Sequence, residues 1–342
     1  MNIAGRAGTV LLMGTLMAGT AFGVYSFLGS HRSARLAERV VKKPTQVQSL
    51  VPLPGALYFV QAGAIYRLEK RSFKEIASAN GWRDLSPAPG GQLFAVRRGS
   101  NFSDLYLLAS DGTVVKQITH NRSSGVPRNH WIFFPRLAPD EKTVWFSYDQ
   151  PKGANYLIDF AIWSMPVSGS LAQARQWTIP FNYTGGDVYP IPLGPSKFLY
   201  VRYDLDDQSR PFSQVDIATR PNVFGTPLTP AQQNCTQPAL SPGNELVAMI
   251  CSPGHGQTNQ LSLATFNGNK LGPLRVLVSG QLMSQPVWAP DGSGLVYLSP
   301  DSPGGPFQLW WLPMRNGGSA GAPRIVAKNL AVDAGAIPCW LA

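Results

Sequence analysis

The segment QPVWAPDGSGLVYL, residues 285–298, consists of a short apolar strand, a tight turn and a second apolar strand. A similar segment, QPALSPGNELVAMI, occupies residues 237–250, and weaker copies begin at Arg83, Phe134 and Tyr189. The prolines at the five turns lie 52, 56, 47 and 48 residues apart, by subtraction: Pro87, Pro139, Pro195, Pro242 and Pro290. A repeat of this length, with strand patterns and no helical pattern inside it, predicts the blades of a β-propeller.

The two ends of the repeat array complement each other. Residues 337–342, IPCWLA, match only the first strand of a repeat, and Trp340 follows Trp288 by 52 residues. Residues 55–60 and 64–68 begin a repeat that lacks its first strand. We therefore predict an all-β fold: a six-bladed propeller of four-stranded antiparallel blades, closed by pairing of residues 336–341 with residues 57–60. Such closure removes the two unpaired edges of an open array.

Composition agrees with a globular β protein. The chain has 342 residues, of which 44% are apolar, enough to bury a large core. The 34 Gly and 30 Pro are spread along the chain without a low-complexity run, which is typical of turns and not of disorder.

The head of the chain is apolar and then basic. Residues 7–30 contain no charged side chain, and 24 helical residues would span about 36 Å, enough for the roughly 30 Å hydrocarbon core of a membrane. We predict one N-terminal hydrophobic helix, a signal anchor or signal peptide at 1–30, a basic juxtamembrane linker at 31–54, and the propeller at 55–342. Cleavage near Ala21 is the alternative to an uncleaved anchor.

Orientation across the membrane has two interpretations. The cluster at 31–43 has five basic residues and one acid, which by the positive-inside rule favours a cytoplasmic propeller. A single apolar segment after Arg6 instead resembles an ordinary export signal. The expected localisation is a membrane-anchored propeller on the exported side, periplasmic or extracellular, with a secreted or a cytoplasm-facing protein as alternatives.

The net charge of +10 does not indicate nucleic-acid binding. Residues 1–43 hold six Lys or Arg and one Glu, which leaves 23 basic and 18 acidic residues, a net +5, for the rest of the chain. The blades contain no basic stripe interleaved with aromatic residues.

The segment PVWAPDG at 286–292 resembles the P-x-W-S-P-D-G repeat of TolB-type β-propellers, which links the two inner strands of each blade. The resemblance extends over residues 55–342 and is best in the sixth blade. It implies a binding platform in the cell envelope. The motif marks a blade turn and carries no catalytic chemistry.

Motifs for catalysis or metal binding are weak. GGSAG at 317–321 matches the hydrolase pattern G-x-S-x-G, but it joins two expected strands, and the last His of the chain, His255, precedes it. We interpret Ser319 as part of a hairpin loop. The four His and three Cys show no metal-ligand spacing, and residues 204–207, DLDD, lack a calcium-loop pattern. No cofactor or metal is expected.

Two cysteines fall at facing positions. In the fifth repeat the position of the turn determines which residues of the two strands face each other: the numbers of two facing residues should add up to about 486 or 487. The numbers of Cys235 and Cys251 add up to 486. The pair is therefore either a cross-strand disulfide or two small core residues that coincide. Cys339 has no evident partner.

One face of the propeller is the candidate binding surface. The second-to-third strand loops and the blade-to-blade connections should share this face, and such loops are where rigid scaffolds bind ligands. Both signs of charge occur there, which favours a protein or peptide partner. The candidate residues are Arg97, Arg98, His120, Arg122, Arg128, His130, Tyr148, Asp149, Lys152, Arg202, Asp204, Asp206, Asp207, Arg210 and His255.

Two functions are consistent with the sequence. The first is a non-catalytic, monomeric propeller, membrane-tethered through residues 7–30 or exported, that binds a protein or peptide in the cell envelope. The alternative is an envelope enzyme of the six-bladed type, a hydrolase or lyase acting on sugars or lactones.

Overall fold

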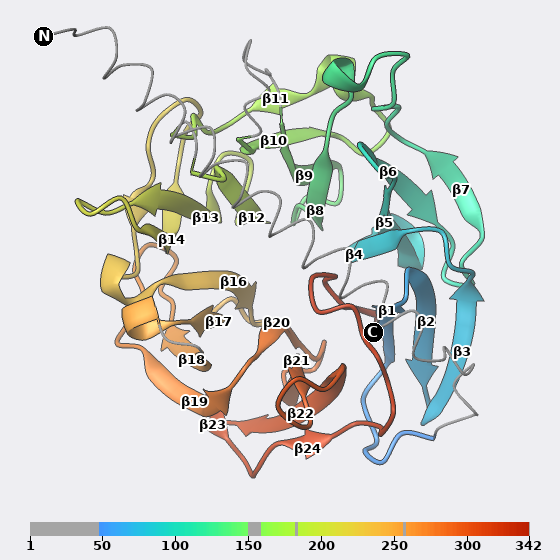
Figure 1. Cartoon of the computed structure of the whole chain (residues 1–342), viewed down its shortest axis with the longest axis vertical. Coiled ribbons are helices and arrows are strands. Elements are labelled where there is room, and N and C mark those ends of the chain that lie inside the picture. Colours follow the sequence, from blue (N-terminus) through green and yellow to red (C-terminus); the bar gives the residue numbers. More distant parts are fainter. Residues whose placement is uncertain (1–47, 150–158, 182–183, 256–257, 342) are drawn as a thin grey trace, which may run out of the picture. The chain divides into compact units, whose positions relative to one another are not determined.

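The computed structural model describes residues 48–149, 159–181, 184–255 and 258–341. The chain divides into two compact units, 1–45 and 46–342, and all described strands belong to the second. This unit is an all-β propeller of six antiparallel blades arranged around an axis, as the repeats predict (Figure 1).

Each blade is a sheet whose first strand is innermost. Blade one consists of β25 (Cys339–Leu341), β1 (Ala56–Gln61), β2 (Ala64–Glu69) and β3 (Ser72–Ala77), and blade two of β4 (Trp82–Ala88), β5 (Gln92–Arg98), β6 (Ser103–Leu108) and β7 (Val114–Gln117). Blade three consists of β8 (Ile132–Leu137), β9 (Thr143–Tyr148), β10 (Ala161–Pro166) and β11 (Arg175–Gln176), and blade four of β12 (Asp187–Pro192), β13 (Phe198–Leu205), β14 (Pro211–Ala218) and β15 (Thr226–Pro227). Blade five consists of β16 (Cys235–Leu240), β17 (Leu246–Cys251), β18 (Asn259–Thr265) and β19 (Arg275–Gln281), and blade six of β20 (Ser284–Trp288), β21 (Gly294–Pro300), β22 (Phe307–Arg315), β23 (Gly318–Ser319) and β24 (Arg324–Ile325).

The sixth blade has a divided outer edge. Both β23 and β24 pair with β22, at Met314–Arg315 and at Trp310–Trp311 respectively, so two short pieces stand where the other blades have a fourth strand. Helical structure in the described ranges consists of short 3-10 turns: η1 (Pro89–Gly91), η2 (Val126–Arg128), η3 (Leu171–Gln173), η4 (Ala231–Gln233) and η5 (Pro253–His255).

The inner hairpin of each blade depends on its turn residues. In blade six the Asp291 carboxylate accepts hydrogen bonds from the backbone N–H (3.0 Å) and the hydroxyl (2.7 Å) of Ser293, the local bonding that favours Asp in turns. The next residue, Gly292, has φ of +72°, a left-handed conformation that suits glycine. Asn244 takes the equivalent position in blade five, with φ of +59°. The proline-containing repeats therefore mark turns, as predicted.

The core lies between neighbouring blades. Buried side chains form six clusters among the described residues, one for each blade-to-blade interface. The second strand of each blade is apolar on both faces, as in residues 57–60, 93–96 and 295–298, because it is covered by a blade on each side.

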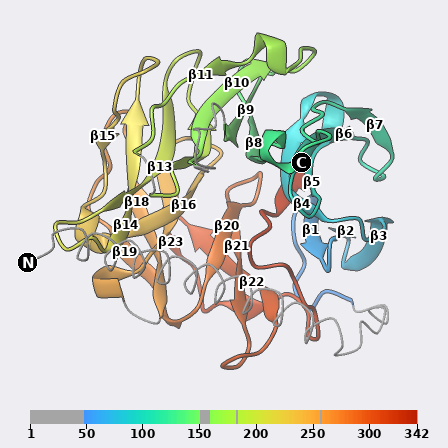
Figure 2. The ribbon, with the colours of Figure 1, turned by 45° about the horizontal axis from the view of Figure 1, so that its top comes forward.

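The ring closes through the C-terminal strand, which lies beside β1 in both Figure 1 and Figure 2. β25 pairs with β1 at Tyr58↔Cys339, Leu57↔Trp340 and Ala56↔Leu341. The paired strand is shorter than the predicted 336–341, because the Ile337 carbonyl instead accepts a hydrogen bond from the Leu85 amide of blade two (3.0 Å). The Trp340 indole packs against Trp311 (5.9 Å between rings) and donates to the Pro54 carbonyl.

The predicted membrane-anchored localisation is not supported. In the part of the chain that the structure describes, no helix is long and apolar enough to cross a membrane. The segment 7–30, on which that interpretation depended, lies outside the described residues, as do the predicted helix and most of the linker. We therefore do not retain the membrane anchor.

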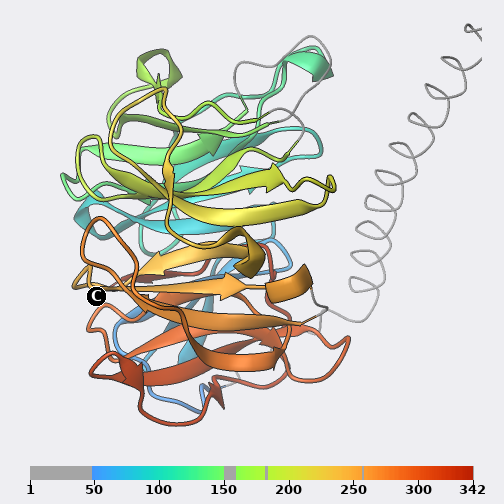
Figure 3. The ribbon, with the colours of Figure 1, turned by 90° about the vertical axis from the view of Figure 1, so that its left-hand side faces the viewer.

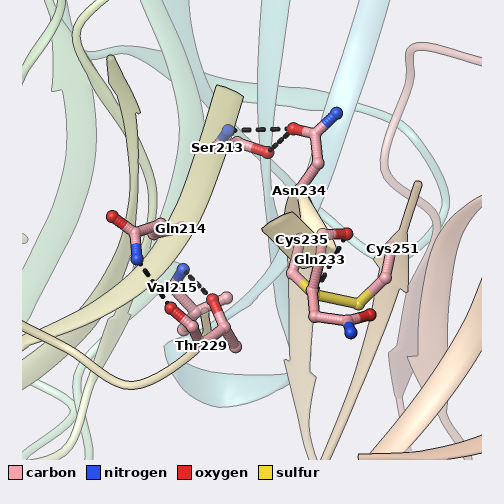
Figure 4. The surroundings of a disulfide bond; sticks show 8 residues. All are labelled: Ser213, Gln214, Val215, Thr229, Gln233, Asn234, Cys235 and Cys251. Carbon is pink, nitrogen blue, oxygen red and sulfur yellow. Dashed lines mark hydrogen bonds between the residues drawn. A yellow bond between two sulfur atoms is a disulfide. The ribbon is translucent and has the colours of Figure 1, made fainter. Parts of the chain in front are cut away.

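A disulfide joins the first two strands of blade five (Figure 4). The register pairs Cys235 with Cys251 and, beyond a bulge, Leu240 with Val247. These pairs add up to 486 and 487, so the bulge accounts for both sums that the turn allows. Both cysteines are buried, and Cys339 is buried with a free thiol.

Ring closure gives the first testable prediction. Replacing Trp340 by Ala should lower the free energy of unfolding by about 3–5 kcal/mol, because it leaves a cavity beside Trp311 and removes a partly buried hydrogen bond. Trp340→Phe, which keeps a ring but loses the donor to Pro54, should cost only about 1–2 kcal/mol. Both are measured by denaturant unfolding. A Trp340→Ala variant that unfolds like the wild type would contradict the importance of closure.

The disulfide gives the second testable prediction. It links residues 16 positions apart, and constraint of the unfolded chain over a loop of that size stabilises by about 3 kcal/mol. A reducing agent should therefore lower the melting temperature of the wild type to that of the Cys235→Ala/Cys251→Ala double variant. The double variant itself should not respond to reduction. An equal response of both proteins would indicate that reduction acts elsewhere.

Candidate binding face and axial cluster

The candidate residues lie on the face that the strand directions define. The first strand of each blade starts where the second strand ends, as the pairs Trp82↔Arg97, Ile132↔Tyr148 and Asp187↔Arg202 show. The strands run across the thickness of the ring, so these ends gather on one side (Figure 3). We call this side, formed by the second-to-third strand loops and the blade-to-blade connections, the loop face.

Exposure divides the candidate residues into three groups. Six are exposed: Arg98, His120, Arg122, Arg128, Asp207 and Arg210. Four are partly exposed: Arg97, His130, Asp204 and Asp206. Three are buried: Tyr148, Asp149 and Arg202. Lys152 and the side chain of His255 lie outside what the structure describes.

The junction of blades two and three brings several candidates together. Asp149 accepts hydrogen bonds from the Trp131 amide (2.9 Å) and pairs with Nδ1 of His130 (3.0 Å). The Tyr148 hydroxyl donates to the Asn121 side chain (3.0 Å). Burial raises the pKa of Tyr148, so its hydroxyl stays protonated and remains a donor. These buried groups hold the connection between the blades against blade three.

A second group, with buried charged residues, lies in blade four beside the connection that precedes it. The Arg202 guanidinium donates to Asp187 (3.1 Å) and lies 3.9 Å from a carboxylate oxygen of Asp216. The rings of Phe181 and Phe224 stack on each other at 4.9 Å and lie close to the same guanidinium, 5.5 and 4.8 Å from its Cζ. Arg202 therefore links the first and third strands of blade four, and its charge is not available on the loop face.

Burial raises the pKa of Asp216 to about 6, although the positive charge of Arg202 opposes the shift. The second oxygen of this carboxylate, Oδ1, has no hydrogen-bond partner in the described part of the chain. An ionised Asp216 is therefore incompletely compensated.

Residues at the propeller axis form a site that the sequence patterns did not identify. A bulge interrupts the innermost strand of blades two to six, and each bulge contains one non-glycine residue with positive φ. These are Asp84, Phe134, Tyr189, Gln237 and Gln285, with φ between +48° and +56°. Four of them precede a proline, so the repeated X-Pro pair was the available signal.

Contacts across the axis connect these residues. Phe134 of blade three stacks on Tyr189 of blade four at 4.0 Å. The Gln285 side chain of blade six donates to the Tyr189 hydroxyl (3.3 Å), and its backbone amide donates to the Gln237 side chain of blade five (2.7 Å). Gln285 thus reaches past blade five to blade four, which places these side chains at the axis.

Two charged groups complete this set. Asp84 of blade two accepts a hydrogen bond from Arg83 (3.1 Å). Arg136 of blade three interacts electrostatically with Asp84, with Tyr189 and with Cys339 of blade one. We call Asp84, Arg136, Tyr189, Gln237, Gln285 and Cys339, one from each blade, the axial cluster.

In the part of the chain that the structure describes, no group of three or more His, Cys, Asp or Glu could hold a metal ion. Ser319 lies in β23, is exposed, and donates a hydrogen bond to the Gly321 carbonyl two residues later (2.6 Å).

Comparison with known proteins identifies the fold. No family model matches the sequence, and no curated protein matches it. The structure is similar to TolB from Acinetobacter baumannii, with a TM-score of 0.60 and 16% identity over 85% of this chain and 67% of TolB. It is also similar to a hydrazine synthase from Kuenenia stuttgartiensis, with a TM-score of 0.59 and 11% identity over 86% of this chain and 48% of the other. The predicted TolB-type propeller fold is confirmed, and at these identities the similarity concerns the fold alone.

The raised pKa of Asp216 predicts a pH dependence of stability. Between about pH 4, the ordinary value for Asp, and pH 6, the folded protein holds a proton that the unfolded chain has released. Stability from this group is therefore present at low pH and is lost as pH rises through 6, by about 2–3 kcal/mol. Denaturant unfolding of wild type and Asp216→Asn at pH 4 and pH 7 measures this: the variant should lose less stability over the interval. Asp207→Asn, at an exposed carboxylate, is the matched control and should follow the wild type.

Proposed function

We propose that this protein is a protein- or peptide-binding propeller that uses its loop face. The observation that carries the proposal is the connection between blades two and three, residues 118–131. It contains the 3-10 turn η2 and carries exposed side chains at His120, Arg122, Val126 and Arg128, of which Val126 is 59% exposed.

Buried side chains hold this connection in place. The amide of Asn121 donates to Asp104 (2.7 Å), and the side chain of Asn121 donates to the Ser103 carbonyl (2.7 Å). At the far end the Asn129 side chain accepts from the Ser123 amide (2.6 Å) and donates to Asn101 (3.0 Å). The exposed tip is therefore ordered before binding, which lowers the entropic cost of association.

The tip combines two arginines with apolar surface. A guanidinium binds a carboxylate through paired hydrogen bonds, and an adjacent exposed valine gains from burial against a partner. These properties favour a protein or peptide that presents an acidic group beside an apolar side chain. The exposed Asp207 and Arg210 of blade four add a second charged segment to the same face.

The fold does not decide between binding and catalysis, since similar structures belong to TolB and to a hydrazine synthase. The proposal for binding therefore depends on the loop face and not on the comparisons.

Site-specific photo-crosslinking in native cells tests the proposal. A photoreactive amino acid at Arg122 or Arg128 should give defined crosslinks to a protein or peptide. The same amino acid at Glu141 or Asn244, exposed turn residues of the opposite face, should give none.

Purified partner and protein then provide a quantitative test. Arg122→Glu/Arg128→Glu should weaken binding at least tenfold, because both charges are reversed, whereas Glu141→Lys should change it less than twofold. Equal crosslinking from the two faces, or unchanged affinity of the double variant, would contradict the loop-face proposal.

A further inference from the structure

The axial cluster contains an arginine without a carboxylate partner. Arg136 makes one hydrogen bond, from Nη1 to the carbonyl of its neighbour Pro135 (3.1 Å), and forms no ion pair within 4.0 Å among the described residues. Loss of hydration lowers its pKa, and Asp84, Tyr189 and Cys339 oppose this shift only from a distance. A partly exposed guanidinium in this state retains donors for an acceptor from outside the protein.

Asp84 offers a hydrogen-bond acceptor, whereas Arg136 offers donors. Its side chain is fully buried, and Oδ2 accepts from Arg83. The other oxygen, Oδ1, has no hydrogen-bond partner within the described residues. A buried carboxylate oxygen left in this way costs free energy, which a donor from a ligand would recover.

Neutral groups of the cluster add further hydrogen-bonding capacity. The Tyr189 hydroxyl accepts from Gln285 (3.3 Å), so its own proton remains available for donation. The Gln237 carbonyl oxygen accepts from the Gln285 backbone, while its amide nitrogen makes no hydrogen bond to the described residues. Phe134, stacked on Tyr189, supplies an apolar wall.

We propose that the axial cluster binds a carboxylate that has a neighbouring N–H group, with the carboxylate on Arg136 and the N–H on Asp84. This chemistry occurs in a free amino acid and in the C-terminal residue of a peptide. Tyr189 and Gln237 would donate to the carboxylate, and a simple anion would leave Asp84 unsatisfied.

The cluster adjoins the loop face. Asp84, Phe134, Tyr189, Gln237 and Gln285 each lie within three residues of the start of their strand, and those starts adjoin the loop face. Phe134, Arg136, Tyr189 and Gln237 keep partial exposure, whereas Asp84 and Gln285 are buried, so neighbouring side chains must move for a ligand N–H to reach Asp84. The site does not depend on the function proposed above, because a free amino acid could occupy it without a protein partner.

Calorimetric titration of the full chain with small probes tests this inference. N-acetylglycine mimics a peptide C-terminus, glycine is a free amino acid, and N-acetylglycinamide lacks the carboxylate. At least one of the first two should bind at least tenfold more tightly than the amide. Tighter binding of N-acetylglycine identifies a chain terminus as the source, and tighter binding of glycine identifies a free amino acid. Equal binding of acid and amide, or no binding of any probe at 10 mM (about 3 kcal/mol of affinity), would overturn the inference.

Variants separate the two charges. Arg136→Gln should abolish binding of the acid, and Asp84→Asn should weaken it about tenfold while leaving acetate binding unchanged. Arg128→Gln, on the loop face, should change neither, which distinguishes this site from the loop-face function. In the absence of ligand, Arg136→Gln should melt close to the wild-type temperature, because Arg136 is partly exposed and makes no ion pair among the described residues. A marked decrease in melting temperature would show that Arg136 is structural and would count against a ligand site.

Discussion

Pairing of β25 with β1 is the constraint on which the rest of this structure depends. The paired residues Leu57 and Trp340 are 283 positions apart in the chain, by subtraction, so the contact costs a large loop-closure entropy. This entropy loss is offset because closure gives every innermost strand a neighbour on each side around the axis. Closure also removes both unpaired edges of the array. The same constraint places one side chain from each blade at the axis.

The axial bulges explain how a symmetric architecture acquires an asymmetric site. Each bulged residue adopts a left-handed conformation that costs roughly 1–2 kcal/mol for a residue other than glycine. The geometry recurs in five blades, but the side chains are Asp84, Phe134, Tyr189, Gln237 and Gln285. The same backbone geometry therefore places a chemically different side chain at the axis in different blades. Backbone strain that recurs beside incompletely satisfied polar groups is typical of functional sites.

The sequence predicted the fold more completely than the site. Turn residues such as Asp291 and Gly292 act locally, so their spacing revealed the blades and the closing strand. The burial of Arg202 could not be predicted, because it depends on Asp187, Asp216 and two phenylalanines from separate segments. An arginine next to a polar loop has the sequence pattern of a surface residue. The membrane interpretation was drawn from residues 7–30, and no spanning helix occurs in the described residues.

At the axis, the side chains that favour stability differ from those that favour ligand binding. A propeller selected only for stability would fill this region with apolar side chains, as it does between blades, where the clusters around Leu57 and Phe146 consist of buried apolar residues. Here Arg136 lacks an ion-pair partner among the described residues and Asp84 keeps an unsatisfied oxygen. Mutation to apolar residues would be an easy route to greater stability, since replacing buried charges is often neutral or favourable. These groups lower stability, and such a loss of stability is typical of residues kept for function. Binding of a ligand to Arg136 and Asp84 explains why the chain has them.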